Sequence, residues 1–214
     1  MKYQSNLPDM SGLKFLPGPH RYILQQGTVT LQLPSVTQLI RFISNEFYGQ
    51  IDPDTLHKAA DRGTRVHEAI ELIDQGIWTP IEDDTAGYIE AYQRWKTDFE
   101  PEIIATEWRG YHRTMLYAGT MDKIVRLPNQ GEDMAIVDIK TSSTYIPFLV
   151  DVQLAGYAQM IESWPGMKID STWGLQLKPD GSYKFHRTQE LSRMKTYFNM
   201  CYALHNAVQL QKEA

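Results

Sequence analysis

The chain has one cysteine, Cys201, among its 214 residues. One thiol cannot form an intramolecular disulfide, a thiolate zinc site or a cysteine-held iron–sulfur cluster, so the sequence excludes all three. No apolar run approaches the roughly 20 residues that a membrane-spanning helix needs. The first twelve residues also lack the apolar stretch and small-residue cleavage site of a signal peptide. We therefore expect a cytoplasmic protein that does not enter a membrane.

Positive charge is also scarce, because the formal net charge is −5 and the basic residues form no continuous run. This argues against a protein that coats nucleic acid by bulk electrostatics. It does not argue against a nuclease, in which clustered carboxylates make the average acidic while a local basic strip holds phosphates. The length and the apolar fraction of 42% suit one globular domain spanning residues 1–214.

Periodicity predicts the elements of the first half of the chain. Alternation over 20–33 around Gln25-Gln26-Gly27 indicates a hairpin, and Ser35 or Thr37 is expected to cap the helix that follows. Later helices are predicted from about Pro53 to Gln75, ended by Gly76, and over 83–99.

The second half is predicted to alternate between strands and helices. The three-strand segment ends at a short apolar strand, Ile136-Val137-Asp138-Ile139-Lys140. We expect an α/β fold, with a mixed central sheet flanked by helices in the order α-β-β-β-α-β. The predicted strands are 103–109, 114–127, 134–140, 169–177 and 183–187, and the predicted helices are 148–162 and 191–211.

The strand that ends at Lys140 carries the first candidate for chemistry. Side chains alternate along a strand, so Asp138 and Lys140 project from one face. The carboxylate is suited to hold a divalent metal, and the ammonium to stabilise charge that develops on a phosphate. The same Asp-x-Lys pattern equally fits an ordinary ion pair on an edge strand, so it does not decide the function by itself.

The preceding strand carries Gly119-Thr120-Met121-Asp122. A turn at 128–131 should pair this strand antiparallel with the next and bring Asp122 beside Asp138. Two neighbouring carboxylates repel each other unless a cation lies between them, and such oxygen ligands suit Mg²⁺ or Mn²⁺. The alternative is a solvated Asp122 that pairs with Lys123 or Arg126.

Two helices add further candidates. His67 lies one turn after Gly63 and beside the apolar stripe of its helix, where it is either an additional metal ligand or a packing residue. Gln153 and Tyr157 share one face of the helix after the Lys140 strand. They are expected to contact substrate or hold the lysine, although Tyr157 also fits as part of the core.

The order of these motifs resembles the RecB-like, phage-type branch of the PD-(D/E)XK nuclease superfamily. GTxxH on a helix is followed by an acid on the next strand (Glu107), then GxxD, DxK and QxxxY, over about residues 60–177. The resemblance implies a restriction-endonuclease-like core at 53–187, preceded by a hairpin and helix within 1–50 and followed by a closing helix at 190–211. Met121 replaces the proline that names the superfamily, and cluster-binding cysteines are absent.

The resemblance also implies roles. Asp122 and Asp138 would bind metal, with His67 and the carbonyl of Ile139 as further ligands and Lys140 as the catalytic lysine. Glu107 would help to ligate metal or orient water, while Gln153 and Tyr157 would contact substrate. Basic residues near the motifs are expected to contact DNA phosphates: Arg62, Arg65, Arg109, Arg113 and Lys178.

The function implied is a Mg²⁺- or Mn²⁺-dependent DNA exonuclease of phage or prophage recombination and repair. A single-strand annealing recombination protein is the implied partner, and ring-forming relatives make a homo-oligomer one arrangement to consider. The alternatives are a non-catalytic DNA-binding module with the same fold and a structure-specific endonuclease or RNase. Retention of both acids and the lysine favours the enzyme.

Overall fold

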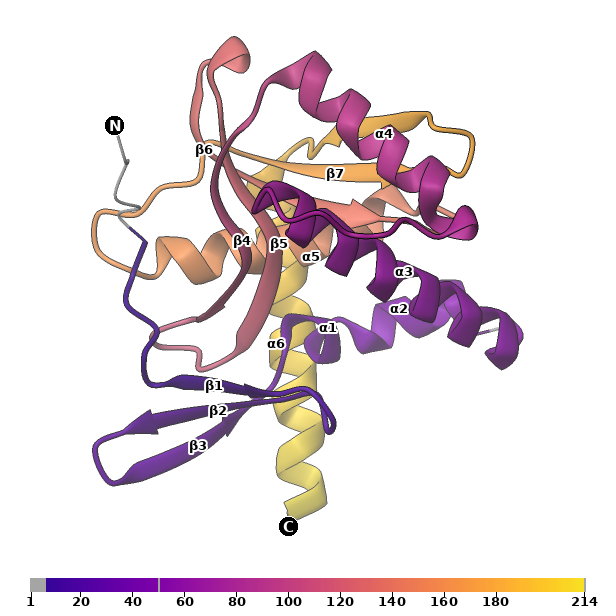
Figure 1. The fold of residues 1–214 in the computed structure, drawn as a ribbon. Coiled ribbons are helices and arrows are strands. Elements are labelled where there is room, and N and C mark those ends of the chain that lie inside the picture. The colour runs from indigo at the N-terminus through magenta and orange to yellow at the C-terminus, as the bar shows by residue number, and fades with distance from the viewer. Residues whose placement is uncertain (1–6, 50, 214) are drawn as a thin grey trace.

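A computed structural model describes residues 7–49 and 51–213 (Figure 1). Two sheets and six helices are arranged along the described chain, with a short 3-10 turn at Pro128–Gln130. The elements are β1 (Leu13–Leu16), β2 (Arg21–Gln26), β3 (Val29–Leu33), α1 (Val36–Leu39), α2 (Arg41–Tyr48), α3 (Pro53–Asp74), α4 (Asp83–Phe99), β4 (Glu102–Tyr111), β5 (Ala118–Leu127), β6 (Glu132–Lys140), α5 (Pro147–Glu162), β7 (Ser171–Leu177), β8 (Tyr183–Arg187) and α6 (Leu191–Glu213).

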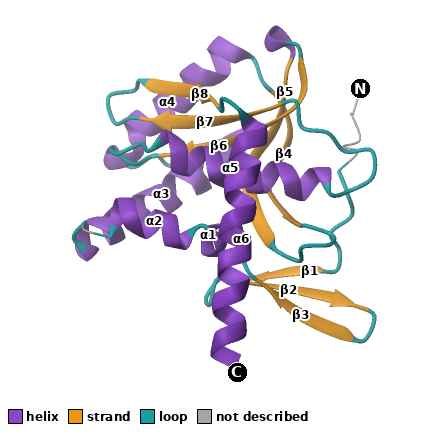
Figure 2. Ribbon diagram, turned by 180° about the vertical axis from the view of Figure 1, so that it is seen from behind, coloured by secondary structure: helices purple, strands orange, loops and turns teal. Residues whose placement is uncertain are grey.

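A five-stranded mixed sheet, in the order β4-β5-β6-β7-β8, forms the centre of the molecule. Its neighbours are antiparallel except β6 and β7, which are parallel and joined through α5, as a parallel connection requires a crossover. Helices α3 and α4 cover one face, and α5 and α6 cover the other (Figures 1 and 2). The predicted α/β class and the α-β-β-β-α-β order are therefore confirmed.

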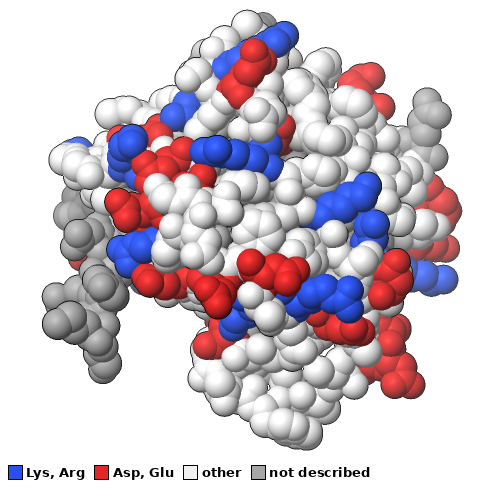
Figure 3. Space-filling model, turned by 90° about the horizontal axis from the view of Figure 1, so that it is seen from above, with Lys and Arg blue, Asp and Glu red and all other residues white. Residues whose placement is uncertain are grey.

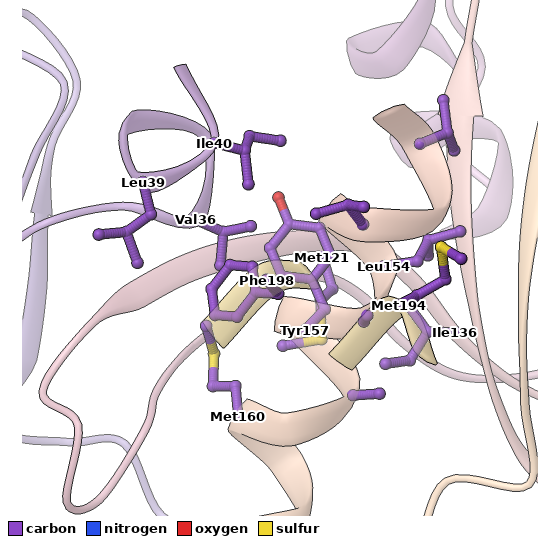
Figure 4. Packing of buried hydrophobic residues seen from close by; sticks show 14 of the residues in the cluster. Val36, Leu39, Ile40, Met121, Ile136, Leu154, Tyr157, Met160, Met194 and Phe198 are labelled. Carbon is purple, nitrogen blue, oxygen red and sulfur yellow. The ribbon is translucent and has the colours of Figure 1, made fainter. Parts of the chain in front are cut away.

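Each face of the sheet buries its own apolar cluster, and the two clusters hold the strands from both sides. Figure 4 shows the cluster on the α5 face, where each fully buried large apolar side chain contributes roughly 1.5–3 kcal/mol. Its labelled members come from α1 (Val36, Leu39, with Ile40 after it), the sheet (Met121, Ile136), α5 (Leu154, Tyr157, Met160) and α6 (Met194, Phe198).

The amino-terminal strands form a separate antiparallel sheet, β1-β2-β3, beside the ends of β4 and β5 (Figure 1). The predicted hairpin is its β2–β3 part, while β1 was not predicted. Ser35 follows this sheet, caps α1 in a capping box with Gln38 as predicted, and bridges to Ala118 at the start of β5. This bridge brings the small sheet against the edge of the large one.

The largest differences from the predicted elements lie at 114–117 and at Ile40. The strand expected from Thr114 begins at Ala118, because the His112 ring accepts the backbone N–H groups of Thr114 and Met115 and Leu116 has a left-handed φ of 53°. The helix after Ser35 is interrupted at Ile40, which separates α1 from α2. None of the described helices combines the length and hydropathy that a membrane span requires.

Candidate active site

The carboxyl-terminal end of β6 places Asp138 and Lys140 side by side. Lys140 Nζ lies 2.7 Å from Asp138 Oδ2, and the Asp138 side chain is only 3% exposed. Gln153 on α5 joins the two: its Nε2 donates to Asp138 Oδ1 at 3.2 Å, and its Oε1 accepts from Lys140 Nζ at 3.2 Å. The same Nε2 lies 3.1 Å from the Tyr157 hydroxyl. Gln153 and Tyr157 thus hold the Asp–Lys pair in place.

Asp122 lies at the same level of the sheet on β5. The antiparallel register pairs Lys123 with Val137, as the predicted turn required, so Asp122 and Asp138 follow at matching positions. Asp122 Oδ2 accepts the backbone N–H of Ile139 at 2.6 Å, which fixes the carboxylate against β6. The other oxygen, Oδ1, is directed toward α3, where it lies 3.6 Å from His67 Nδ1.

Glu107 on β4 completes a cluster with Asp122 and His67. Its φ of 46° is left-handed in the middle of a strand, a conformation that costs a non-glycine residue roughly 1–3 kcal/mol and is concentrated at functional sites. Glu107 Oε1 lies 3.5 Å from His67 Nδ1. One nitrogen of His67 and one carboxylate oxygen each of Glu107 and Asp122 lie within 4.8 Å of one another.

The pKa values record how strongly these groups interact. Burial lowers the pKa of His67, but the carboxylates of Asp122 and Glu107 outweigh burial and raise that pKa to about 9. Burial raises the pKa of Asp138 to about 6, with Lys140 opposing the rise and Asp122 adding to it. Burial also disfavours the Lys140 ammonium, yet Asp138 and Asp122 raise its pKa above the ordinary value. The positive charges of the His67 imidazolium and the Lys140 ammonium therefore balance the negative charge of the neighbouring carboxylates.

This donor set fits a divalent cation. An imidazole nitrogen and two carboxylate oxygens from three separate elements converge, and the raised pKa of His67 shows that the two acids favour a positive charge between them. Carboxylate oxygens suit Mg²⁺ and Mn²⁺, and an added imidazole suits the transition metal. His67, Glu107 and Asp122 are therefore the residues that would hold the ion, with Asp138 and Ile139 in the same cleft.

The cleft around these residues has a volume of about 860 Å³. Helix α3 forms one wall, where Gly63 faces Thr141 so closely that a Cβ would lie 3.3 Å from its Oγ1. Glu71 also lines this wall and accepts a hydrogen bond from Gln75. The cleft is also lined by amino-terminal residues that no motif had indicated, namely Phe15, Thr37 and Tyr48.

The five basic residues expected near DNA are placed very differently. Arg109 lines the cleft, and Arg62 donates to the Thr141 carbonyl at its rim, at 3.4 Å. Arg65 pairs with Asp61, Glu82 and Asp84. Arg113 lies over the Trp164 ring, and Lys178 lies at the turn between β7 and β8; neither lines the cleft. On the face in Figure 3, acidic and basic side chains are interspersed rather than gathered into one basic surface.

A buried ionic network adjoins the His67–Glu107–Asp122 cluster. Lys123, next to Asp122, is 2% exposed and places Nζ 2.6 Å from Asp74 Oδ2 while donating to the Thr106 hydroxyl. Asp74 also accepts from Tyr92 and Lys96, at 2.6 and 2.8 Å. The network joins the three elements that carry the cluster, because Asp74 shares α3 with His67, and Thr106 precedes Glu107 on β4.

Comparisons with known proteins give fold likeness only. No family model and no curated protein matches the chain. Among solved structures, a protein from Eubacterium rectale assigned as an exonuclease has a TM-score of 0.48 and 13% identity, covering 82% of each chain. The alkaline exonuclease LHK-Exo from Laribacter hongkongensis gives 0.37 and 12%, covering 85% of this chain and 93% of that one. LHK-Exo with dAMP gives 0.41 and 15%, covering 85% and 89%. Likeness at this level does not decide the activity.

Proposed function

We propose that this protein is a metal-dependent nuclease that hydrolyses DNA phosphodiester bonds in the cleft between α3 and the central sheet. One observation carries the proposal. A cluster suited to a divalent cation (His67, Glu107 and Asp122) and a buried Asp138–Lys140 pair line the same cleft. This combination supplies both components that phosphodiester hydrolysis needs, a cation site and a fixed positive charge.

Lys140 supplies the fixed positive charge in this mechanism. Its ammonium is held by Asp138 and Gln153, so it needs no rearrangement when negative charge develops on the phosphate. Preorganised charge of this kind stabilises a transition state more than the ground state. The raised pKa of Lys140 keeps it protonated at neutral pH.

The remaining residues bind and orient. When bound by His67, Glu107 and Asp122, Mg²⁺ or Mn²⁺ would supply Lewis acidity toward water and phosphate oxygens. The Ile139 N–H fixes the orientation of the Asp122 carboxylate, and the left-handed backbone of Glu107 fixes the direction in which its side chain projects. Arg109 lines the same cleft and is positioned to hold a phosphate beside the cluster. Arg65, Arg113 and Lys178 do not line the cleft, and their role as phosphate contacts around the metal site stays a prediction.

The biological setting follows from the motif resemblance. Exonuclease action in phage-type recombination or repair, with a single-strand annealing protein as partner, is the setting proposed.

The test incubates the protein with 5′- and 3′-labelled linear duplex, single strands and closed circles, in Mg²⁺, Mn²⁺ or EDTA. We expect metal-dependent release of labelled nucleotides from linear DNA and no cutting of closed circles. Lys140→Ala, purified in the same way, is the control for contaminating nucleases and should lose at least about 10²-fold in rate. Cutting of closed circles would show that the activity is that of an endonuclease and not that of an exonuclease. Equal rates of hydrolysis by wild-type protein and Lys140→Ala would show that the active site lies elsewhere.

A further inference from the structure

A second, smaller cleft of about 200 Å³ adjoins the active-site cleft. The two clefts share Phe15, Thr37, Glu107 and Arg109, so a ligand that extends from the metal-binding cluster can enter the smaller one directly. The volume lies below the roughly 300–1,000 Å³ of pockets that hold a whole small molecule. It therefore suits one ring system at the end of a larger ligand.

Aromatic rings from the amino-terminal sheet line this second cleft. Phe15 on β1 contacts the His20 ring edge-on at 5.1 Å between centroids, and the Tyr22 ring at 4.8 Å. His20 ends the Pro17-Gly18-Pro19 turn with a left-handed φ of 49°, and its backbone N–H donates to the Pro17 carbonyl at 3.1 Å. Prolines and this hydrogen bond restrict the turn, so it presents the exposed His20 ring in a fixed position.

Arg109 lies where the two clefts meet. Its guanidinium carbon is 5.2 Å from the Phe15 ring centroid, and within the described chain no carboxylate forms an ion pair with it. An exposed cation beside an acidic cluster is free to bind a phosphate.

We propose that the smaller cleft is a nucleobase subsite, in which one unpaired base packs against Phe15 and His20, face to face with one of these perpendicular rings and edge-on to the other, while Arg109 holds the adjoining phosphate. The inference rests on the proposed nuclease function and names the part of the DNA that occupies this cleft. Successive bases of single-stranded DNA commonly stack on aromatic side chains beside a cationic groove. The base must be unpaired, because the cleft has room for one ring system.

The subsite should accept any base. Its hydroxyl groups already have partners: Tyr22 pairs with Thr120 at 2.8 Å, Ser35 pairs with Thr37 at 2.9 Å, and Tyr157 accepts from Gln153 at 3.1 Å. They therefore offer little to distinguish base edges. Stacking depends on the π face that every base has, so we expect recognition of a base without strong sequence preference.

The experiment measures binding with Ca²⁺ in place of Mg²⁺ to suppress hydrolysis. Single-stranded oligonucleotides end in 2-aminopurine, in an ordinary base, or in an abasic sugar at the same position. The ordinary base should bind roughly 5- to 150-fold more tightly than the abasic sugar, as expected for one stacked base. The fluorescence of 2-aminopurine should fall on binding.

Variants separate stacking from charge. Phe15→Ala combined with His20→Ala should abolish the difference in affinity between ordinary and abasic ends, and Phe15→Leu keeps apolar packing if the double variant folds poorly. Arg109→Gln should weaken both ligands equally, because both retain the phosphate. Phe42→Ala, an exposed phenylalanine outside both clefts, is the matched control and should change neither.

Equal affinity of wild-type protein for ordinary and abasic ends, without fluorescence change, would overturn the subsite. Hydrolysis of the same oligonucleotides in Mg²⁺ is measured separately. If the protein cleaves DNA but binds ordinary and abasic ends equally, the subsite is contradicted and the nuclease function is not. Base-dependent binding without cleavage supports the subsite and contradicts the nuclease.

Discussion

The buried network that adjoins the cluster offers a sharp test of how the site is supported. Lys123 and Asp74 have side-chain exposures of 2% and 4% and are 2.6 Å apart. Removing one partner of such a pair typically costs about 3–5 kcal/mol, because the other charge is left buried without compensation. The two single variants should differ within that range, since their remaining partners differ.

Lys123→Met leaves Asp74 with hydrogen bonds from Tyr92 and Lys96, so its cost should be near 3 kcal/mol. Asp74→Asn leaves the Lys123 ammonium with the Thr106 hydroxyl and no carboxylate, so its cost should approach 5 kcal/mol. The double variant Asp74→Leu, Lys123→Met fills the space with apolar groups and should recover much of the loss.

Equilibrium urea unfolding of the variants measures these costs. Although burial raises it, the hydrogen bonds from Lys123, Lys96 and Tyr92 hold the pKa of Asp74 below its ordinary value. Its stabilisation is therefore complete above that ordinary value, near pH 4, and is lost as the pH falls further through the folded-state pKa. Asp74→Asn should lack this acid-dependent loss. A cost below 1 kcal/mol for both single variants, or the reverse order, would refute the reasoning.

Three further predictions concern the cleft itself. Asp122→Asn and Asp138→Asn should each reduce the rate of DNA hydrolysis by at least about 10²-fold, or roughly 3 kcal/mol, with unchanged circular dichroism; a near-normal rate in either would contradict its role. His67→Ala should weaken Mn²⁺ binding in calorimetry, whereas unchanged affinity with a lower Tm would assign His67 to packing. Mg²⁺ or Mn²⁺ at 100 times its Kd should stabilise the folded protein by about 2.7 kcal/mol, and a melting curve indifferent to both would exclude a bound metal.

Much of the fold could be predicted because its signals are local. The predicted 83–99 helix agrees with α4, and the predicted 183–187 strand agrees with β8, since periodicity and flanking turns define both. Strand β1 was missed because its four residues are too few to show alternation. The segment at 114–117 was assigned to a strand because its hydrogen bonds to the His112 ring have no sequence signal.

The same distinction applies to the site. Asp138, Lys140 and Asp122 could be brought together because strand alternation and one turn fix their relation. The left-handed backbone of Glu107 depends on its neighbours in three dimensions, so its place beside His67 could not be derived from spacing.

Proximity to the motifs in the sequence did not predict which other residues line the cleft. Arg65 lies near the motifs but pairs with Asp61 and with two acids on or before α4. Phe15 and Tyr48 line the cleft from the amino-terminal region, which only the tertiary fold brings there. Contacts of this kind follow from packing between distant segments and have no local pattern.

The central claim is that the cleft cuts DNA through its own Asp–Lys pair, with a divalent cation. Single-turnover cleavage of end-labelled linear DNA by wild-type protein and Lys140→Ala, with Mn²⁺ bound equally by both in calorimetry, tests it most directly. We predict a rate at least about 10²-fold lower in the variant and no cleavage by either protein in EDTA. Equal rates in the two proteins, or cleavage that persists in EDTA, would contradict the claim.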